Sequence, residues 1–500
     1  MRSTMPWLPA EVWYLIRGLL EDDKRTLSRL CRTCKSLREF AEPALYARYS
    51  IFIGPQDHVA RARRFAAFYR TVLDTPRLAA RVVFLQLIIA VPTDEAGRRS
   101  AADEIAALLR RTVAERFRFG YGVDRVVKRE WGVVPLAALL PFLLPNLEQF
   151  QNFEARHYPA LRLVRCLHRG GRLPSLKKLT HMVLNPDTFD PRGSCGRPDA
   201  FRLGSVAPLM ELAPNLQDLT FYSCQGHEPT NSRRRRRRLS TTDDTTHQEE
   251  GEGEVSFPPL LPKFPASLQS LHLKYGHFNA AELTHALSDC RRLRRFAYSE
   301  GGPNMFKPAS GVLNYHDITP GQVIEALRPV ARDTLERLEL SLWCAPRLRN
   351  VGTPRLIRGN LGDAFPNLAE VSLSAEDLFW TLGPKPTTAL DTDGRLLLDL
   401  LPEPTLRVLE FPEFDALLVP DLRRLAEAVA CEGRFPRLRA VRVNVAPEDP
   451  GRVEEYMRRF LPELETLEPK QRAGLAGLFG RGGVVVELGP HWMWGDGEDE

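Results

Sequence analysis

Eight cysteines and eleven histidines are the residues of this 500-residue chain best suited to metal or nucleophilic chemistry. Only Cys31 and Cys34 lie close together, as a CxxC pair. A zinc site of this type needs a second pair of Cys or His ligands, and none follows nearby in the sequence. Both thiols fall on a predicted helix. We therefore expect reduced, buried thiols in a reducing compartment, with no metal and no cofactor.

The known catalytic motifs give no better candidate. The sequence contains no phosphate-cradling GxxxxGK[ST], no HExxH and no GxSxG. The stretches HMVLNPD and NYHD combine His with Asp, as chance alone produces in a chain of this length. The Gly-rich stretch at 474–483 lacks the spacing of a dinucleotide loop, and we interpret it as a turn before a final strand. The sequence therefore predicts a protein that is not an enzyme.

The net charge of +6 has one source, a run of six consecutive arginines. The rest of the chain is near neutral, so we do not expect a nucleic-acid partner. The run is a candidate nuclear signal or nucleic-acid patch, or it pairs with the acidic stretch that follows. Ser240, in RRLS, is a candidate phosphorylation site. Residues 231–259 hold almost no apolar side chain and predict a disordered loop. The six arginines are Arg233, Arg234, Arg235, Arg236, Arg237 and Arg238.

The first hydrophobic pattern lies at residues 8–20, LPAEVWYLIRGLL. Charged residues interrupt it, so it is not a signal peptide. Pro9 suits a first helical turn. A single helical stripe follows, consisting of Val12, Leu15, Ile16, Leu19 and Leu20. The longest apolar run, at 133–145, is too short to span a membrane. The pattern thus predicts an amphipathic helix in a protein without membrane spans.

Two further stripes follow this helix. The second consists of Leu27, Leu30, Cys31 and Cys34, and the third of Leu37, Phe40, Ala41, Ala44 and Leu45. Pro43 should end or kink the third helix. Three short helices cannot bury a large core alone, so they must pack on the rest of the chain or on a partner.

Residues 5 to about 52 resemble an F-box, in the form common in filamentous fungi. The resemblance rests on Leu8-Pro9, the Glu11-Val12 step, LSRLCRTCKSLRE and PALYARYSIF. Trp13 and the CxxC pair are not general features of that family. The resemblance implies binding to a Skp-type adaptor, and through it to a cullin–RING ubiquitin ligase. The implied adaptor-binding residues are Leu8, Pro9, Val12, Leu15, Ile16, Leu19, Leu27, Leu30, Cys31 and Leu37. The alternative is an ordinary helical cap on a larger core.

After this segment a phrase of the form Leu-x-x-Leu-x-Leu recurs, which is the signature of leucine-rich-repeat strands. Its first Leu, or the residue in its place, falls at 147, 176, 216, 268, 293, 335, 368, 406, 438 and 464. Further strands are predicted near 82 and 483. Helical stripes separate the strands, so we expect parallel strands with right-handed crossovers. The intervals run from 25 to 52 residues, as in the degenerate arrays behind fungal F-boxes. A non-repetitive α/β domain is the alternative.

The predicted fold class is α/β, a three-helix F-box followed by an irregular solenoid with concave strands and convex helices. We expect an F-box at 1–52, repeats at 53–230, the loop at 231–259, repeats at 260–490 and an acidic tail at 491–500. The polar strand positions predict a face that binds a target protein, with candidates Tyr222, His272, Lys274, Arg337, Glu339, Glu370, Arg442 and Asn444.

Two functional hypotheses follow from this organisation. The first is a substrate-recognition subunit of a cullin–RING ubiquitin ligase of the SCF type, located in the cytoplasm, the nucleus or both. The second is a scaffold or nucleic-acid-associated protein whose N-terminal helices only cap the repeats. Exposure of the first apolar stripe would favour the first hypothesis, because an exposed apolar patch indicates a partner site.

Overall fold

The computed structural model describes sixteen stretches of the chain, and every structural statement below concerns these residues. They are 9–21, 23–54, 58–89, 102–118, 133–154, 159–185, 201–222, 224–225, 261–274, 276, 278–299, 318–342, 359–374, 396–412, 418–443 and 469–488. The chain divides into two compact units. The first is Met1–Ser194 with Ser205–Leu219, and the second is Cys195–Gly204 with Thr220–Glu500.

Three helices begin the first unit: α1 (Ala10–Leu19), α2 (Lys24–Thr33) and α3 (Lys35–Ala47). The α2 helix starts at Asp23, whose carboxylate accepts hydrogen bonds from the Thr26 amide and hydroxyl at 2.9 and 2.6 Å. These bonds lower the pKa of Asp23, because they stabilise its charged form. A small core of Leu27, Ala41 and Ala44 joins α2 to α3.

One expectation for these helices is wrong, and one of the two alternatives for Pro43 is excluded. Cys34 is not helical, because its extended backbone forms the junction between α2 and α3. Pro43 does not end α3, which continues to Ala47. Ala41 and Ala44, on either side of this proline, pack into the core with α2 and hold both turns in place.

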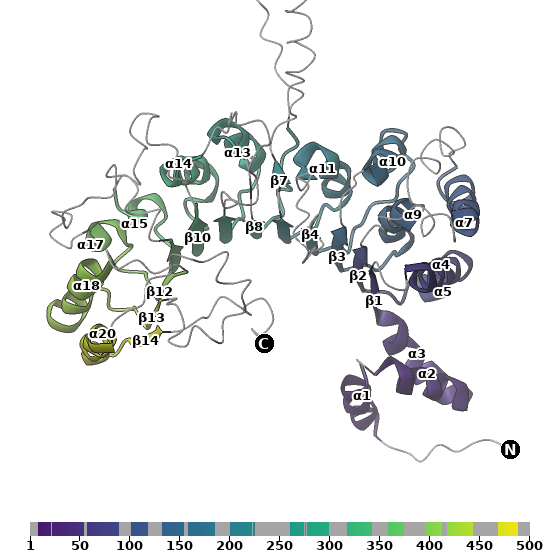
Figure 1. Ribbon diagram of the computed structural model, residues 1–500, viewed down its shortest axis with the longest axis horizontal. Coiled ribbons are helices and arrows are strands. Elements are labelled where there is room, and N and C mark those ends of the chain that lie inside the picture. The colour runs from purple at the N-terminus through teal and green to yellow at the C-terminus, as the bar shows by residue number, and fades with distance from the viewer. Residues whose placement is uncertain are drawn as a thin grey trace, which may run out of the picture. The chain divides into compact units, whose positions relative to one another are not determined.

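Parallel strands β1 (Arg48–Ile53), β2 (Phe84–Ile89), β3 (Gln149–Glu154) and β4 (His181–Asn185) follow in the first unit. Next in order is β6 (Asp218–Tyr222), at the boundary between the units. Helices lie along one face of these strands (Figure 1). They are α4 (His58–Asp74), α5 (Pro76–Ala79), α7 (Ala102–Glu115), α9 (Val133–Leu139), α10 (Pro159–Arg169) and α11 (Leu203–Leu212), with the 3-10 turn η1 (Leu140–Leu143). The first strand, β1, falls inside the range assigned to the F-box.

The second unit continues the same alternation of helix and parallel strand. Its strands are β8 (Ser270–Lys274), β9 (Arg295–Ser299), β10 (Arg337–Ser341), β11 (Glu370–Leu373), β12 (Val408–Phe411), β13 (Ala440–Val443) and β14 (Val485–Leu488). Its helices again lie on one strand face (Figure 1): α13 (Ala280–Leu287), α14 (Pro320–Ala331), α15 (Leu361–Ala364), α17 (Leu396–Leu400), α18 (Val419–Glu432) and α20 (Pro469–Arg481). A separate pair joins β5 (Phe201–Arg202) to β7 (Cys224–Gln225). Within the described residues, the main sheet has twelve strands in chain order.

One backbone arrangement recurs at the start of the strands. The Arg294 carbonyl accepts hydrogen bonds from the amides of Glu336 and Arg337, and the Glu336 carbonyl accepts from those of Ala369 and Glu370. The carbonyls of Val83, Glu148, Thr180, Gln269, Ala369 and Arg407 each accept two successive amides in the same way. Neighbouring repeats therefore meet at one fixed offset, one residue after the first Leu of the phrase. The phrase at 176 is the exception, because there the bridging residue Thr180 follows Leu179 and not Leu176. This regularity is consistent with a repeat array.

The first Leu of each described phrase is buried, with at most 6% of its surface exposed. The next two apolar positions face the same core: Leu338 and Leu340 of β10 are fully buried, whereas Arg337, Glu339 and Ser341 are half-buried on the other face. The predicted strand register is thus confirmed at β10. The phrase at 464 lies outside the described residues. The buried first leucines are Leu147, Leu176, Leu216, Leu268, Leu293, Leu335, Leu368, Leu406 and Leu438.

A side-chain clamp adds to these contacts, and the sequence phrase alone did not point to it. In five phrases, the residue just before the first Leu donates a hydrogen bond from its side chain to the backbone of the preceding segment. Asn215 bonds the Lys177 carbonyl at 2.7 Å, and Asn367 bonds the Asp333 carbonyl at 2.8 Å. Asn146, Thr334 and Thr405 make similar bonds to the carbonyls of Ala80, Leu293 and Leu368. At these phrases the PNL and TL steps therefore fasten one repeat to the one before it.

Candidate functional site

The first candidate site is the apolar stripe of α1. Leu15 and Leu19 expose 69% and 86% of their surface, and Val12 and Ile16 are half-buried. Pro9 is exposed at the start of the helix, and its carbonyl accepts the Val12 amide at 3.0 Å. Leu8 lies outside the described residues. Two large apolar side chains one turn apart thus project from α1 into solvent, as is typical of a partner-binding helix.

Three of the predicted adaptor-binding residues contribute to the packing between α2 and α3. Leu27 is fully buried in the core between α2 and α3, and Leu30 and Cys31 pack against that core. Burial raises the pKa of the Cys31 thiol, because desolvation disfavours the thiolate. Leu37 on α3 is half-buried. The residues available to a partner are therefore concentrated on α1.

The second candidate site is the strand face turned away from the helices in the second unit. Its charged residues form pairs across neighbouring strands. Arg337 lies 3.6 Å from Glu370 and 3.9 Å from Glu339, and Arg442 lies 2.9 Å from Glu487. These four predicted target-binding positions, Arg337, Glu339, Glu370 and Arg442, are thus partly neutralised before any target binds.

The remaining predicted target-binding residues lie at the start of the second unit or outside the described residues. The Lys274 ammonium lies 5.2 Å from the centre of the Tyr222 ring and 3.4 Å from its hydroxyl. His272 is half-buried on the same strand as Lys274. Asn444, the arginines Arg233 to Arg238 and Ser240 lie outside the described residues. The described part of the face therefore offers one cationic and aromatic cluster beside the charge pairs.

A polar ladder crosses the strand face of the first unit, at positions that the sequence did not single out. The Ser50 hydroxyl donates to the Gln86 side-chain oxygen at 2.6 Å, and the Gln86 amide donates to Gln151 at 2.8 Å. These residues are direct neighbours in the strand register, because Ser50 of β1 pairs with Gln86 of β2, and Gln86 pairs with Gln151 of β3. The alternation of polar and apolar residues along these strands is the sequence signal that could have identified this row of polar side chains.

One cluster has the order of a catalytic triad. The Thr180 hydroxyl lies 2.8 Å from Nδ1 of His181, whose Nε2 lies 2.9 Å from Asp218. However, Thr180 also bonds the Glu148 carbonyl through both its hydroxyl, at 3.2 Å, and its amide, at 2.9 Å. The described residues around it therefore leave no oriented nucleophile and no amide donor for an oxyanion. We interpret the cluster as a lateral contact between repeats.

The described residues contain no group of three His, Cys, Asp or Glu side chains placed to hold a metal ion. None of their helices is both long and apolar enough to cross a membrane. Cys31, Cys34, Cys166, Cys224, Cys290 and Cys431 are free thiols. Burial raises the pKa of Cys290 to about 12, since a thiolate is disfavoured there.

Comparisons with known proteins add little to this description. No family model matches the chain, and no curated protein sequence matches it. Among solved structures, a chain of the crystal structure of the Rad7 and Elc1 complex in yeast aligns with 81% of this chain and 89% of its own length. The sequence identity is 12% and the TM-score is 0.30. We infer nothing from so low a score.

Proposed function

We propose that this protein is a substrate-recognition subunit of a cullin–RING ubiquitin ligase of the SCF type. In this proposal α1 docks a Skp-type adaptor, and the strand face of the repeats binds a target protein. The protein itself performs no covalent step. It raises the effective concentration of target lysines near the ubiquitin-loaded enzyme.

The observation that supports this proposal best is the exposure of Leu15 and Leu19 on α1. A helix that only capped the repeats would bury its apolar stripe. Here Leu15 and Leu19 of the stripe face solvent, while α2 and α3 have a core of their own. The resemblance of residues 5–52 to an F-box suggests the class of partner, a Skp-type adaptor. The exposed Leu15 and Leu19 are the surface that we expect to bind it.

The proposal is tested by co-purifying the full chain with a recombinant Skp-type adaptor. Replacing both Leu15 and Leu19 with Asp should abolish co-purification. An unpaired charge in a desolvated contact costs several kcal/mol, or about a thousandfold in affinity. The matched control replaces Ala473 and Ala476, two exposed residues of α20, with Asp. Wild-type yield from the Leu15 and Leu19 variant, or equal loss in both variants, would favour a non-ligase scaffold instead.

A further inference from the structure

The α2 helix carries an arginine stripe that packing does not require. Arg25, Arg29 and Arg32 recur at i, i+4 and i+7, so they share one helical face. All three are exposed, and they lie opposite buried Leu27. They hold no ion pair among the described residues. The core therefore does not explain why this face is basic.

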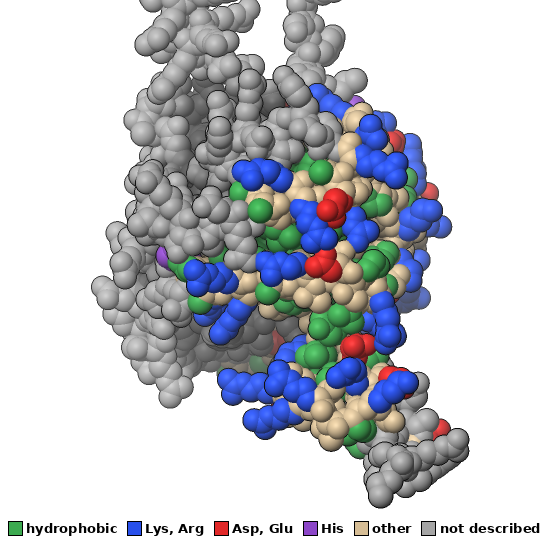
Figure 2. Space-filling model, turned by 90° about the vertical axis from the view of Figure 1, so that its right-hand side faces the viewer, with side chains coloured by type: hydrophobic (Ala, Val, Ile, Leu, Met, Phe, Trp, Pro, Cys, Tyr) green, Lys and Arg blue, Asp and Glu red, His purple; other side chains and the backbone are tan. Residues whose placement is uncertain are grey.

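Exposed arginines are also present on α4. Arg63 and Arg64 are exposed, whereas Phe65 and Tyr69 point into the core. Figure 2 shows many Lys and Arg side chains and fewer acidic ones on this side of the molecule. The first unit thus presents a basic surface that the net charge of the whole chain does not reveal.

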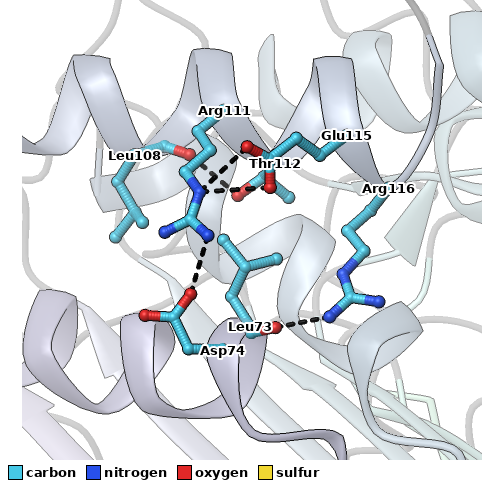
Figure 3. Close-up of polar contacts among 7 residues, drawn as sticks. All are labelled: Leu73, Asp74, Leu108, Arg111, Thr112, Glu115 and Arg116. Atoms are coloured by element: carbon cyan, nitrogen blue, oxygen red, sulfur yellow. Dashed lines mark hydrogen bonds and ion pairs between the residues drawn. The ribbon is translucent and has the colours of Figure 1, made fainter.

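Several acidic side chains of this region are already engaged. Figure 3 shows Arg111 held between Asp74 and Glu115, at 2.8 and 3.1 Å. Glu42 lies 3.1 Å from Arg77, Glu39 lies 3.9 Å from Lys35, and Asp23 caps α2. These acidic groups already have partners, so they do not neutralise the arginines of the α2 stripe by direct ion pairs.

We propose that the α2 stripe, together with Arg63 and Arg64, binds the phosphate backbone of a nucleic acid. Seven residues of helix rise about 10.5 Å. Each strand of a duplex advances about 3.4 Å along the helix axis per phosphate, so the stripe spans about three phosphate steps. Guanidinium groups also bind phosphate in a bidentate manner. A regularly charged polymer fits this spacing better than an acidic protein segment, whose carboxylates follow no such repeat.

The test measures fluorescence anisotropy of a labelled 20-base-pair duplex and a 20-nucleotide single strand with the full chain. One variant replaces Arg25, Arg29 and Arg32 with Ala. The matched control replaces Arg332, Arg423 and Arg437, three exposed arginines of the second unit, with Ala. Both variants keep Arg233 to Arg238, so the contribution of that run cancels. Circular dichroism checks that both remain folded.

We expect the stripe variant to lose affinity for the duplex by roughly tenfold or more at low salt, while the control keeps wild-type affinity. Each lost phosphate contact lowers the slope of log affinity against log salt by about 0.9, so the slope should fall by between 2 and 3. Unchanged binding in the stripe variant, or equal loss in both variants, overturns the proposal. So does binding to poly-L-glutamate of equal charge but not to either oligonucleotide. Adaptor binding through Leu15 and Leu19 should be unaffected.

Discussion

At the scale of single residues, the alternation within β10 separates side chains that hold the fold from those available to a target. Leu338 is fully buried, and its neighbour Glu339 is half-buried on the opposite face. Leu338→Ala should lower the free energy of unfolding by about 2–5 kcal/mol, because it leaves a cavity. Glu339→Ala should cost about 0–1 kcal/mol, as for other partly exposed ion pairs. Denaturant unfolding of both variants checks this. Equal losses would contradict the register.

Asp421 on α18 is a buried carboxyl with a predictable pH effect. It is fully buried and caps α17, accepting the Leu397 amide at 3.4 Å. Burial raises its pKa in the folded protein, because desolvation disfavours the charged form. Its stabilising contribution is therefore complete below its unfolded pKa, near 3.9, and is lost as the pH rises through the folded value.

The variant Asp421→Asn cannot ionise, so its free energy of unfolding should rise relative to wild type as the pH increases from about 4 towards neutrality. Chemical denaturation at several pH values measures this difference. The matched control is Asp399→Asn, at an exposed position of α17. A difference between Asp421→Asn and wild type that stays flat with pH would show that burial does not perturb this carboxyl.

At the scale of elements, the side-chain clamp between repeats should contribute measurably to stability. Thr405 donates its hydroxyl to the Leu368 carbonyl at 2.6 Å. Thr405→Val removes the donor while keeping the shape, and should cost about 1–3 kcal/mol because the carbonyl loses a partner. Thr405→Ser keeps the hydroxyl and should cost less. Thermal unfolding compares the two. Equal losses would mean that the methyl group, rather than the hydrogen bond, matters.

Most strands could be predicted because the Leu-x-x-Leu-x-Leu phrase encodes both the two-residue period and the buried first position. The strand β1 was missed because RYSIFI follows directly from α3 and lacks the Leu of the phrase. Cys34 was placed on a helix because three-residue spacing from Cys31 fits a helical stripe as well as a helix boundary. Periodicity alone cannot separate these two cases.

At the scale of the whole molecule, α1 should be dispensable for folding. Leu15 and Leu19 of its stripe are exposed, Val12 and Ile16 are half-buried, and Leu20, after the helix ends, packs against the core of α2 and α3. Deleting residues 1–19 should therefore change the melting temperature by only about 2 °C or less, while abolishing adaptor binding. Differential scanning calorimetry and co-purification measure the two effects. A large loss of stability would show that α1 is part of the fold.

The candidate sites were less predictable than the fold. The exposed leucines of α1 followed from the stripe, but the burial of Leu27 depends on how α2 meets α3. The basic surface was hidden because the run Arg233 to Arg238 accounts for the net charge, and only the fold brings α2 and α4 into one unit. The pairing of Arg337 with Glu370 likewise requires the register between strands.

The fixed offset at which neighbouring strands meet has a consequence for the lengths of the segments between them. Successive phrases are separated by 25 to 52 residues, a ratio of about two. Closing a flexible loop twice as long costs only about 0.6 kcal/mol more. Loop length outside the helices is therefore nearly neutral for stability, as long as the Leu phrase, its clamp and the helix that packs on the strands are kept. The connections beside the helices, rather than the helices themselves, are accordingly the positions where a reporter domain could be inserted, or where related chains could diverge in length, without disturbing the sheet.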